Sequence, residues 1–253
     1  MLRIFTLLLA AWMLAVPTHT AAQEKATLAS LRVTPDAMTW RAVGRLDAAM
    51  SGFCTATLIA PDLLLTAAHC VYSSKTNRLI KPAGLTFRAG LQKGKAVAER
   101  RIVQVEVHPG YDASAGPSAQ SVGHDVALLR LAEPIGADVL DPFSVQDSAQ
   151  THGPVSVVSY GKGRAESLSA QSACEVLDGY QNVILMDCEA TFGSSGAPIF
   201  NSQNGRREII SLVSSIGQFR GKRTTYGMIL PKLVADLKDQ MRANQTQSLA
   251  DAS

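Results

Sequence analysis

The sequence lacks the features of several large classes of protein. Its net charge is only +3, from 24 Lys and Arg residues against 21 Asp and Glu residues. It has no stripe of basic residues interleaved with aromatic ones, so nucleic acid is not expected as a partner. Basic residues crowd one late region, where the charged edges of a solvated hairpin explain them better than a basic binding rim. These residues are Arg206, Arg207, Arg220, Lys222 and Arg223.

The N-terminus lacks an apolar run long enough for a membrane span. The apolar stretch from Ile4 to Val16 is shorter than the ~20 residues that a spanning helix needs. It follows Arg3 and precedes the small-residue sequence Thr20-Ala21-Ala22. This pattern predicts a signal peptide over residues 1–22, and hence a secreted or periplasmic protein without stable membrane insertion after its removal.

Cysteine is scarce. The four cysteines include no C-x-x-C pair, which argues against a zinc site. Export permits disulfides, and four cysteines allow three pairings. No metal and no organic cofactor are expected.

Helical periodicity is almost absent. Only residues 232–242 have a helical pattern, with Leu233, Leu237 and Met241 on one face. Short apolar segments instead recur at near-regular spacing, which predicts an all-β architecture of barrels. With 46% hydrophobic residues, a chain of 253 residues can bury a substantial core. Strands are predicted at 53–59, 63–66, 85–89, 101–107, 126–131, 155–160, 173–177, 183–188, 197–201, 208–215 and 225–229.

These segments divide the chain into parts. A polar N-terminal arm is expected over residues 23–39, a first half over 40–132 and a connection over 133–150. The second half covers 151–231, the helix 232–243 and a frayed tail 244–253. No internal repeat is visible in the sequence.

One stretch places a serine among small residues. It reads Thr191-Phe192-Gly193-Ser194-Ser195-Gly196-Ala197-Pro198-Ile199-Phe200. Small residues allow the backbone to approach a substrate carbonyl closely. A serine hydroxyl is nevertheless a weak nucleophile without a base, so the stretch alone fits an ordinary turn before a strand equally well.

Two upstream motifs complete a catalytic constellation. His69 stands in Thr-Ala-Ala-His-Cys, and Asp125 directly precedes an apolar strand-like segment, Val126 to Leu131. A histidine, an aspartate and a serine in this order supply base, orienting group and nucleophile. The order differs from that of the α/β-hydrolases, and Ala197 stands where their elbow needs its final glycine.

With these three motifs the chain resembles the trypsin-like, chymotrypsin-fold serine proteases of the bacterial secreted type, over Val43 to Leu237. The resemblance implies two packed six-stranded antiparallel β-barrels with the site between them, followed by a C-terminal helix. It implies His69 as general base, Asp125 as its orienting partner and Ser195 as nucleophile.

The resemblance also assigns supporting residues. The backbone amides of Gly193 and Ser195 would form the oxyanion hole, and Ser214 would be a polar group near the aspartate and the substrate backbone. Asp112 competes with Asp125 but lacks an apolar strand to bury it. Ser194 competes with Ser195, but the family frame G-x-S-G places the reactive serine directly before Gly196. His108 and His124 are expected to flank the site without taking part.

The favoured disulfides follow from the same comparison. Cys54–Cys70 would tie a strand of the first half to the His69 loop, and matches the family's histidine-loop disulfide. Cys174–Cys188 would brace the segment that leads to Ser195.

The chain departs from the digestive enzymes of this family in two ways. Those enzymes carry an aspartate before the nucleophile, which pairs with a freshly cut N-terminus. Here Ser194 occupies that position and no Ile-Val-Gly-Gly start is present, so no activation cleavage of that type is expected. Cys188 stands seven residues before Ser195, and the pattern Cys-x-x-x-x-Gly-Ser-Ser-Gly is closer to bacterial glutamyl-endopeptidase-like relatives.

Specificity has two open interpretations. The glutamyl-specific relatives use a histidine near the position of Val213, and no histidine stands there. Glu189 lies where trypsin-like enzymes have the acidic base of the substrate pocket, which would favour Lys or Arg before the cut bond. If the shifted cysteine reroutes this segment, Glu189 is instead a surface carboxylate.

The expected function is that of a secreted serine endopeptidase that cuts proteins or peptides through an acyl-enzyme. The main alternative is a catalytically inactive homologue that binds a partner in the cell envelope. An esterase-like activity of the same site is a second alternative. The sequence carries no signal for an oligomeric state.

Overall fold

The structure, a computed structural model, describes residues 29–30, 38–49, 52–201 and 207–251. The predicted signal peptide lies outside these residues, as does most of the predicted arm. Two residues of the arm form β1 (Ala29–Ser30), which pairs antiparallel with Ala170 and Ser169. Within the described part of the chain, no helix combines the length and apolarity that a membrane crossing requires.

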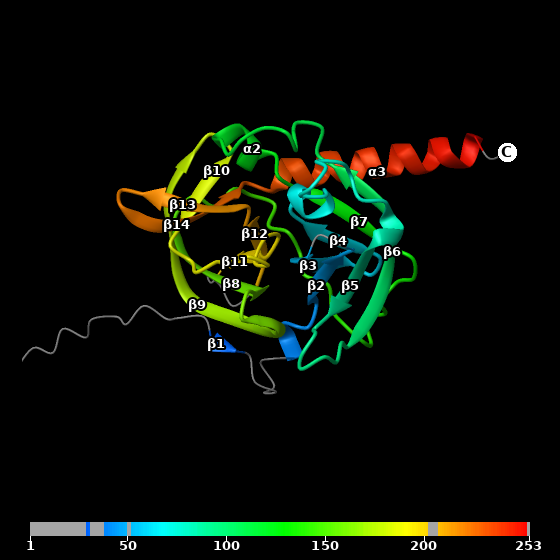
Figure 1. Cartoon of the computed structure of the whole chain (residues 1–253), viewed down its shortest axis with the longest axis horizontal. Coiled ribbons are helices and arrows are strands. Elements are labelled where there is room, and N and C mark those ends of the chain that lie inside the picture. The colour runs from blue at the N-terminus through cyan, green and yellow to red at the C-terminus, as the bar shows by residue number, and fades with distance from the viewer. Residues whose placement is uncertain (1–28, 31–37, 50–51, 202–206, 252–253) are drawn as a thin grey trace, which may run out of the picture.

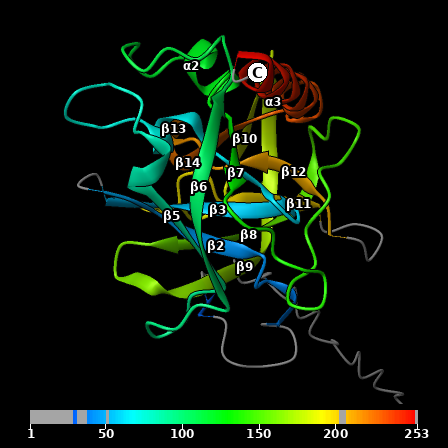
Figure 2. The same cartoon turned by 90° about the vertical axis from the view of Figure 1, so that its right-hand side faces the viewer.

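The first half is a closed antiparallel barrel of six strands, in the order β2-β3-β4-β7-β6-β5 (Figures 1 and 2). Its strands combine a continuous apolar interior with polar outward positions, which is the pattern expected of a small filled barrel. The bounds are β2 (Val43–Ala48), β3 (Gly52–Ala60), β4 (Leu63–Thr66), β5 (Leu85–Ala89), β6 (Ala98–Val107) and β7 (Ala127–Leu131).

The second half is a curled sheet of seven strands, in the order β12-β11-β8-β9-β10-β14-β13. It lies beside the barrel in Figure 1, and differs from the expected six-stranded barrel because its two end strands, β12 and β13, are not paired with each other. The bounds are β8 (Gly153–Gly161), β9 (Arg164–Tyr180), β10 (Val183–Met186), β11 (Pro198–Asn201), β12 (Ile209–Leu212), β13 (Ser215–Phe219) and β14 (Lys222–Met228).

The strand predictions fail most in the second half. The 17-residue β9 is far longer than the predicted 173–177, because its polar and small residues mask an element that pairs with β8 on one side and β10 on the other. The predicted strand 208–215 is in fact two elements. The chain leaves β12 at Leu212 and re-enters the sheet as β13 at Ser215.

Four helical segments are present among the described residues, where the sequence predicts one. Two are short 3-10 turns, η1 (Ala68–Val71) and η2 (Pro82–Gly84). The third, α2 (Ala119–Gly123), lies in a stretch predicted to be loop, and begins at a capping box formed by Ser118 and Ser121.

The C-terminal helix α3 (Pro231–Asp251) begins at a proline, which favours the first helical position, and lies against β6 and β7. It is longer than the predicted 232–243, and the tail expected from 244 is helical to Asp251. Asn244 explains part of this extension, because its side-chain amide donates to the buried Glu106 carboxylate of β6 at 2.9 and 3.0 Å.

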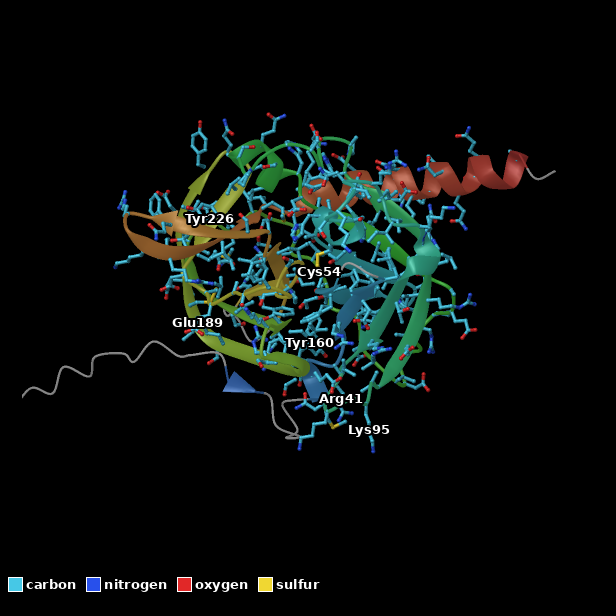
Figure 3. The ribbon with its side chains drawn as sticks, in the orientation of Figure 1. Arg41, Cys54, Lys95, Tyr160, Glu189 and Tyr226 are labelled. Carbon is cyan, nitrogen blue, oxygen red and sulfur yellow. A yellow bond between two sulfur atoms is a disulfide. The ribbon has the colours of Figure 1, made fainter. Side chains whose placement is uncertain are left out.

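A buried core joins the two halves. Trp40 packs against Phe143 of the connection and Phe200 of β11, with ring centroids 5.9 and 5.0 Å apart. Tyr160 of β8 is fully buried between the halves, and its hydroxyl donates to the Leu91 carbonyl of the first half at 3.0 Å (Figure 3). These contacts fix the relative position of the two sheets, and therefore of any site between them.

Candidate active site

The first half brings His69 and Asp125 together. His69 lies on η1, directly after β4, and Asp125 lies two residues before β7. Because β4 and β7 are antiparallel neighbours, with Thr66 opposite Ala127, both residues emerge at the same barrel end. The His69 ring Nδ1 lies 2.7 Å from Asp125 Oδ2, and the His69 backbone N–H donates to Asp125 Oδ1 at 2.9 Å.

Asp125 is buried and fully occupied. Its side chain is 5% exposed, against 35% for His69. The Ser214 hydroxyl, from the second half, donates to Asp125 Oδ2 at 2.6 Å. The carboxylate thus accepts three hydrogen bonds, which hold the His69 ring in the orientation that leaves Nε2 free for another group.

The charge of Asp125 governs the basicity of His69. Burial alone would lower the pKa of His69, but the Asp125 charge and its hydrogen bond outweigh burial and raise that pKa above its ordinary 6.5. The ring is therefore a stronger base than a free imidazole.

A disulfide flanks the histidine. Cys54 of β3 and Cys70 of η1 are bonded, with Cα atoms 6.0 Å apart. Their sulfurs and the His69 ring form a compact group that could otherwise suggest a metal site. Zinc binds thiolates, however, and both sulfurs here are consumed by the disulfide, so this group is a poor metal ligand set.

The Gly193–Gly196 turn requires its glycines. Gly193 has φ +92° and Gly196 has φ +74°, in the left-handed region that side chains disfavour. A Cβ at Gly193 would overlap the Phe53 ring, and one at Gly196 would overlap Thr66 and the Thr55 backbone.

The turn is fixed by hydrogen bonds from both halves. Thr55 of β3 donates its amide to the Ser195 carbonyl at 2.9 Å and its hydroxyl to the Gly193 carbonyl at 2.9 Å. The Phe192 carbonyl accepts from the Lys162 amide at 2.7 Å. In a trans peptide the N–H points opposite to the carbonyl, so the Gly193 N–H points away from Lys162.

Two backbone donors are thereby left available. Among the described residues, no acceptor is recorded for the amides of Gly193 or Ser195. Both residues line the cavity that also contains His69. No hydrogen bond joins Ser195 Oγ to His69 in this structure, and such contacts commonly tighten only when substrate is bound.

Cavities extend on both sides of His69. One, of about 590 Å³, includes Phe53, Lys162 and the 83%-exposed Phe192. The other, of about 220 Å³, includes Asp125 and Ser214. A substrate chain could therefore continue in both directions from the nucleophile.

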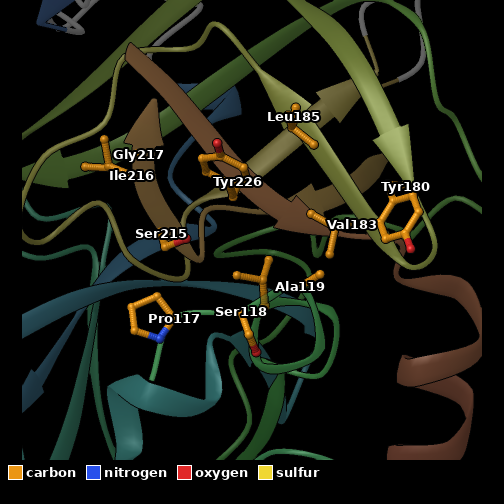
Figure 4. Close-up of a pocket in the computed structure, with 11 residues that line it drawn as sticks. Pro117, Ser118, Ala119, Tyr180, Val183, Leu185, Ser215, Ile216, Gly217 and Tyr226 are labelled. Atoms are coloured by element: carbon orange, nitrogen blue, oxygen red, sulfur yellow. The ribbon is translucent and has the colours of Figure 1, made fainter. Parts of the chain in front are cut away.

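The second of these cavities adjoins an apolar pocket of about 410 Å³ (Figure 4), with which it shares Pro117, Val122 and Ser215. The α2 segment forms one side of this pocket, and strands β9, β10, β13 and β14 form the other. Its apolar lining consists mainly of Pro117, Val122, Val183, Leu185, Ile216 and Tyr226.

Glu189 fits neither of its two interpretations fully. It is half-buried on the β9 side of the second sheet (Figure 3), directly after Cys188, which is bonded to Cys174. Its backbone N–H donates to Gln171 at 2.7 Å. Burial lowers the pKa of Arg164 to about 10, and the charge of Glu189 acts against this shift. Glu189 is therefore an electrostatic partner of Arg164, and it lines none of the three cavities described above.

The competing candidates lie away from the chemistry. Asp112 is exposed and binds Ser114 at 2.7 Å. Ser194 is fully buried and donates to the Tyr160 carbonyl at 3.0 Å, so its hydroxyl does not face the cavity. His124 stacks on His108, with ring centroids 5.0 Å apart.

Sequence reasoning missed two supporting residues, Thr55 and Arg164. Both make their contacts to the nucleophile turn from distant strands, and neither belongs to a recognisable motif. Only the pairing of the sheets places them there.

Comparisons with known proteins agree with this geometry. The profile of the family described as "Trypsin-like peptidase domain" matches residues 51–207. A "Trypsin-like protease" of Streptomyces glaucescens is 38% identical over 88 residues, covering 34% of this chain and 28% of that protein. "Serine protease 23" of Bos taurus is 26% identical over 190 residues, covering 65% and 49%. The chain thus spans less than half the length of these curated relatives.

A solved structure described as "Structure of Glu endopeptidase in complex with MPD" has the same fold. It superposes with a TM-score of 0.71 at 16% identity, over 87% of this chain and 98% of that one. The family match covers more than half of the sequence, including His69, Asp125 and Ser195. The chain belongs to the trypsin-like peptidase domain family of chymotrypsin-fold serine proteases.

Proposed function

We propose that this protein is a secreted or periplasmic serine endopeptidase that acts through an acyl-enzyme on Ser195. The observation that carries the proposal is the hydrogen-bonded series Ser214–Asp125–His69, which faces the Ser195 turn across one cavity. The two disulfides are consistent with an oxidising compartment.

In the proposed reaction, Ser195 Oγ attacks the peptide carbonyl while His69 Nε2 takes its proton. Asp125 accepts from Nδ1 and stabilises the imidazolium. The amides of Gly193 and Ser195 receive the negative charge that develops on the carbonyl oxygen. His69 then gives its proton to the leaving amine, and water releases the acyl group by the same steps.

The substrate is proposed to be an extended protein or peptide segment. Apolar side chains on the α2 side of the cleft would fit the apolar pocket beside the smaller cavity. Such a segment would also reach β13, the end strand of the second sheet, whose backbone can pair with an added strand.

A fluorophosphonate probe tests the proposal, because it reacts with activated serines. The full chain, expressed with its own signal and purified with both disulfides intact, is compared with Ser195→Ala. We expect labelling of the wild type alone, with the adduct on Ser195 by peptide mass spectrometry.

The other outcomes are equally informative. Labelling of both proteins would show that a different serine is reactive. A folded wild type without labelling would overturn the proposal and favour the inactive, partner-binding homologue. If labelling succeeds but only ester substrates turn over, the activity is that of an esterase.

A further inference from the structure

Arg164 reaches the nucleophile turn from behind. It is the first residue of β9, and its guanidinium folds back over β8. Nη1 donates to the Ser159 carbonyl, and Nη2 donates to the Ser159 hydroxyl at 2.8 Å. Nη2 also donates to the Ser194 hydroxyl at 3.1 Å. The planar guanidinium thus joins β8 to the residue directly before Ser195.

Ser194 is fully buried, and its hydroxyl is saturated. The hydroxyl proton is donated to the Tyr160 carbonyl at 3.0 Å. Its lone pairs accept from Arg164 and from the Thr191 amide at 3.2 Å. A hydroxyl offers one donor and two acceptor sites, so these three contacts leave no capacity unused.

The contacts of Ser194 fix the backbone on both sides of it. Thr191 lies before the oxyanion glycine, and the Ser194 carbonyl accepts from the Ala197 amide at 3.0 Å, after the nucleophile. Rotation of the Ser194 side chain or backbone would break several of these bonds at once. The amides of Gly193 and Ser195 therefore depend for their direction on how Ser194 is held.

A buried cation at this point has a second effect. The guanidinium remains protonated at neutral pH, because even the lowered pKa of Arg164 is about 10. Glu189 lies within its electrostatic reach and balances part of its charge. In the low dielectric of the interior, the remaining positive potential favours negative charge that develops nearby in the reaction.

We infer that Arg164 is a positioning residue, whose guanidinium holds Ser194 and thereby keeps the Gly193 and Ser195 amides directed at the developing oxyanion. The inference rests on the proposed function and deepens it. It also gives a physical reason to expect an ordered turn without a cleaved N-terminus, because the cation is supplied from within the chain.

The direct test is Arg164→Met, which keeps most of the side-chain volume but removes every donor. We expect the rate of fluorophosphonate labelling and kcat on a peptide amide to fall by about 100-fold, as small displacements of catalytic groups do. KM should change little, because Arg164 lines none of the substrate cavities. Arg130→Met is the matched control, since Arg130 pairs with Asp62 at 2.6 Å in the first barrel, and its rates should equal the wild type's.

Two further variants keep the inference testable if Arg164→Met does not fold. Ser194→Ala removes the acceptor and should lower kcat by roughly 10-fold or more, again at constant KM. Arg164→Lys retains the charge but loses the fork, so an intermediate rate is expected. Where Arg164→Met folds, its loss and that of Ser194→Ala should not add in the double variant, because each breaks the same contact.

The outcomes separate the two proposals. An unlabelled wild type would reject the proposed function. A labelled wild type with Ser194→Ala and Arg164→Lys reacting at its rate would reject the positioning role and leave the proposed function standing. A decrease in melting temperature without a decrease in kcat, measured well below melting, would likewise reduce Arg164 to a structural residue.

Discussion

Ser214 and Asp125 come from different halves of the molecule and share a 2.6 Å hydrogen bond. The oxygen that accepts it, Oδ2, also accepts from His69 Nδ1 at 2.7 Å. The orientation of the base therefore depends on the docking of the two sheets. A residue of the second half corrects the position of a pair that the first half assembles.

Asp125→Asn should preserve the fold and remove most activity. An asparagine can present its N–H₂ to His69 and so stabilise the wrong tautomer, which costs about 10⁴-fold in kcat for this kind of triad. Steady-state kinetics on a peptide amide measure the loss. Ser214→Ala is the milder companion and should cost about 10-fold, since one of three hydrogen bonds to the carboxylate is lost. Equal losses in both variants would contradict the hierarchy of roles.

The acidic limb of the pH–rate profile should lie above pH 6.5. His69 must be neutral to act as a base, and the net effect of its surroundings raises its pKa above 6.5. Activity therefore falls as the pH decreases through that raised value. In Asp125→Ala the charge and hydrogen bond are absent while burial remains, so the residual activity should show its acidic limb at lower pH. A limb that stays in place would mean that another group controls it.

Gly193→Ala should reduce kcat by about 10²- to 10³-fold, the range for loss of an oxyanion donor. The new Cβ meets the Phe53 ring at a positive φ, so the peptide has to rotate and its N–H turns away. Gly94→Ala is the matched control, because Gly94 has φ +78° but no neighbour closer than 3.7 Å to a new Cβ. It should lose stability and keep its kcat, and the comparison of the two variants isolates the donor.

Glu189→Gln should leave the side-chain preference of cleavage unchanged. The carboxylate interacts with Arg164 and lines none of the cavities beside His69, so it is poorly placed to select Lys or Arg. Cleavage of a peptide library by wild type and variant measures this. Loss of a Lys/Arg preference in the variant would restore Glu189 as the base of the substrate pocket.

The sequence predicts the candidate site better than the scaffold that holds it. His69, Asp125 and Ser195 stand in local motifs, and short apolar runs such as Leu63–Thr66 reveal their strands directly. The Arg164–Ser194 contact spans 30 positions and the Thr55–Gly193 contact 138, and no local pattern records either. Elements stabilised by such distant partners were the ones underestimated, as the length of β9 shows.

The end of α3 is a further case of a distant partner. Glu106 of β6 is 6% exposed and accepts from the side-chain amides of Gln104, Gln240 and Asn244. Amides replace a cation as partners of this carboxylate, and two of them belong to the helix. The polar contacts of this half of α3 with the barrel therefore converge on one residue.

Glu106→Ala should lower the free energy of unfolding by about 3 kcal/mol, since hydrogen bonds to a charged group are lost and buried amides are left unsatisfied. Urea unfolding monitored by tryptophan fluorescence measures the change. The kcat of the folded variant should be unchanged, because the Glu106 contacts lie on β6 and α3, away from the Ser195 turn. Glu133→Ala, at an exposed position, is the control and should differ from wild type by less than about 0.5 kcal/mol. A Glu106→Ala protein as stable as this control would show that the apolar face of α3 alone, through Leu237 and Met241, suffices to dock the helix.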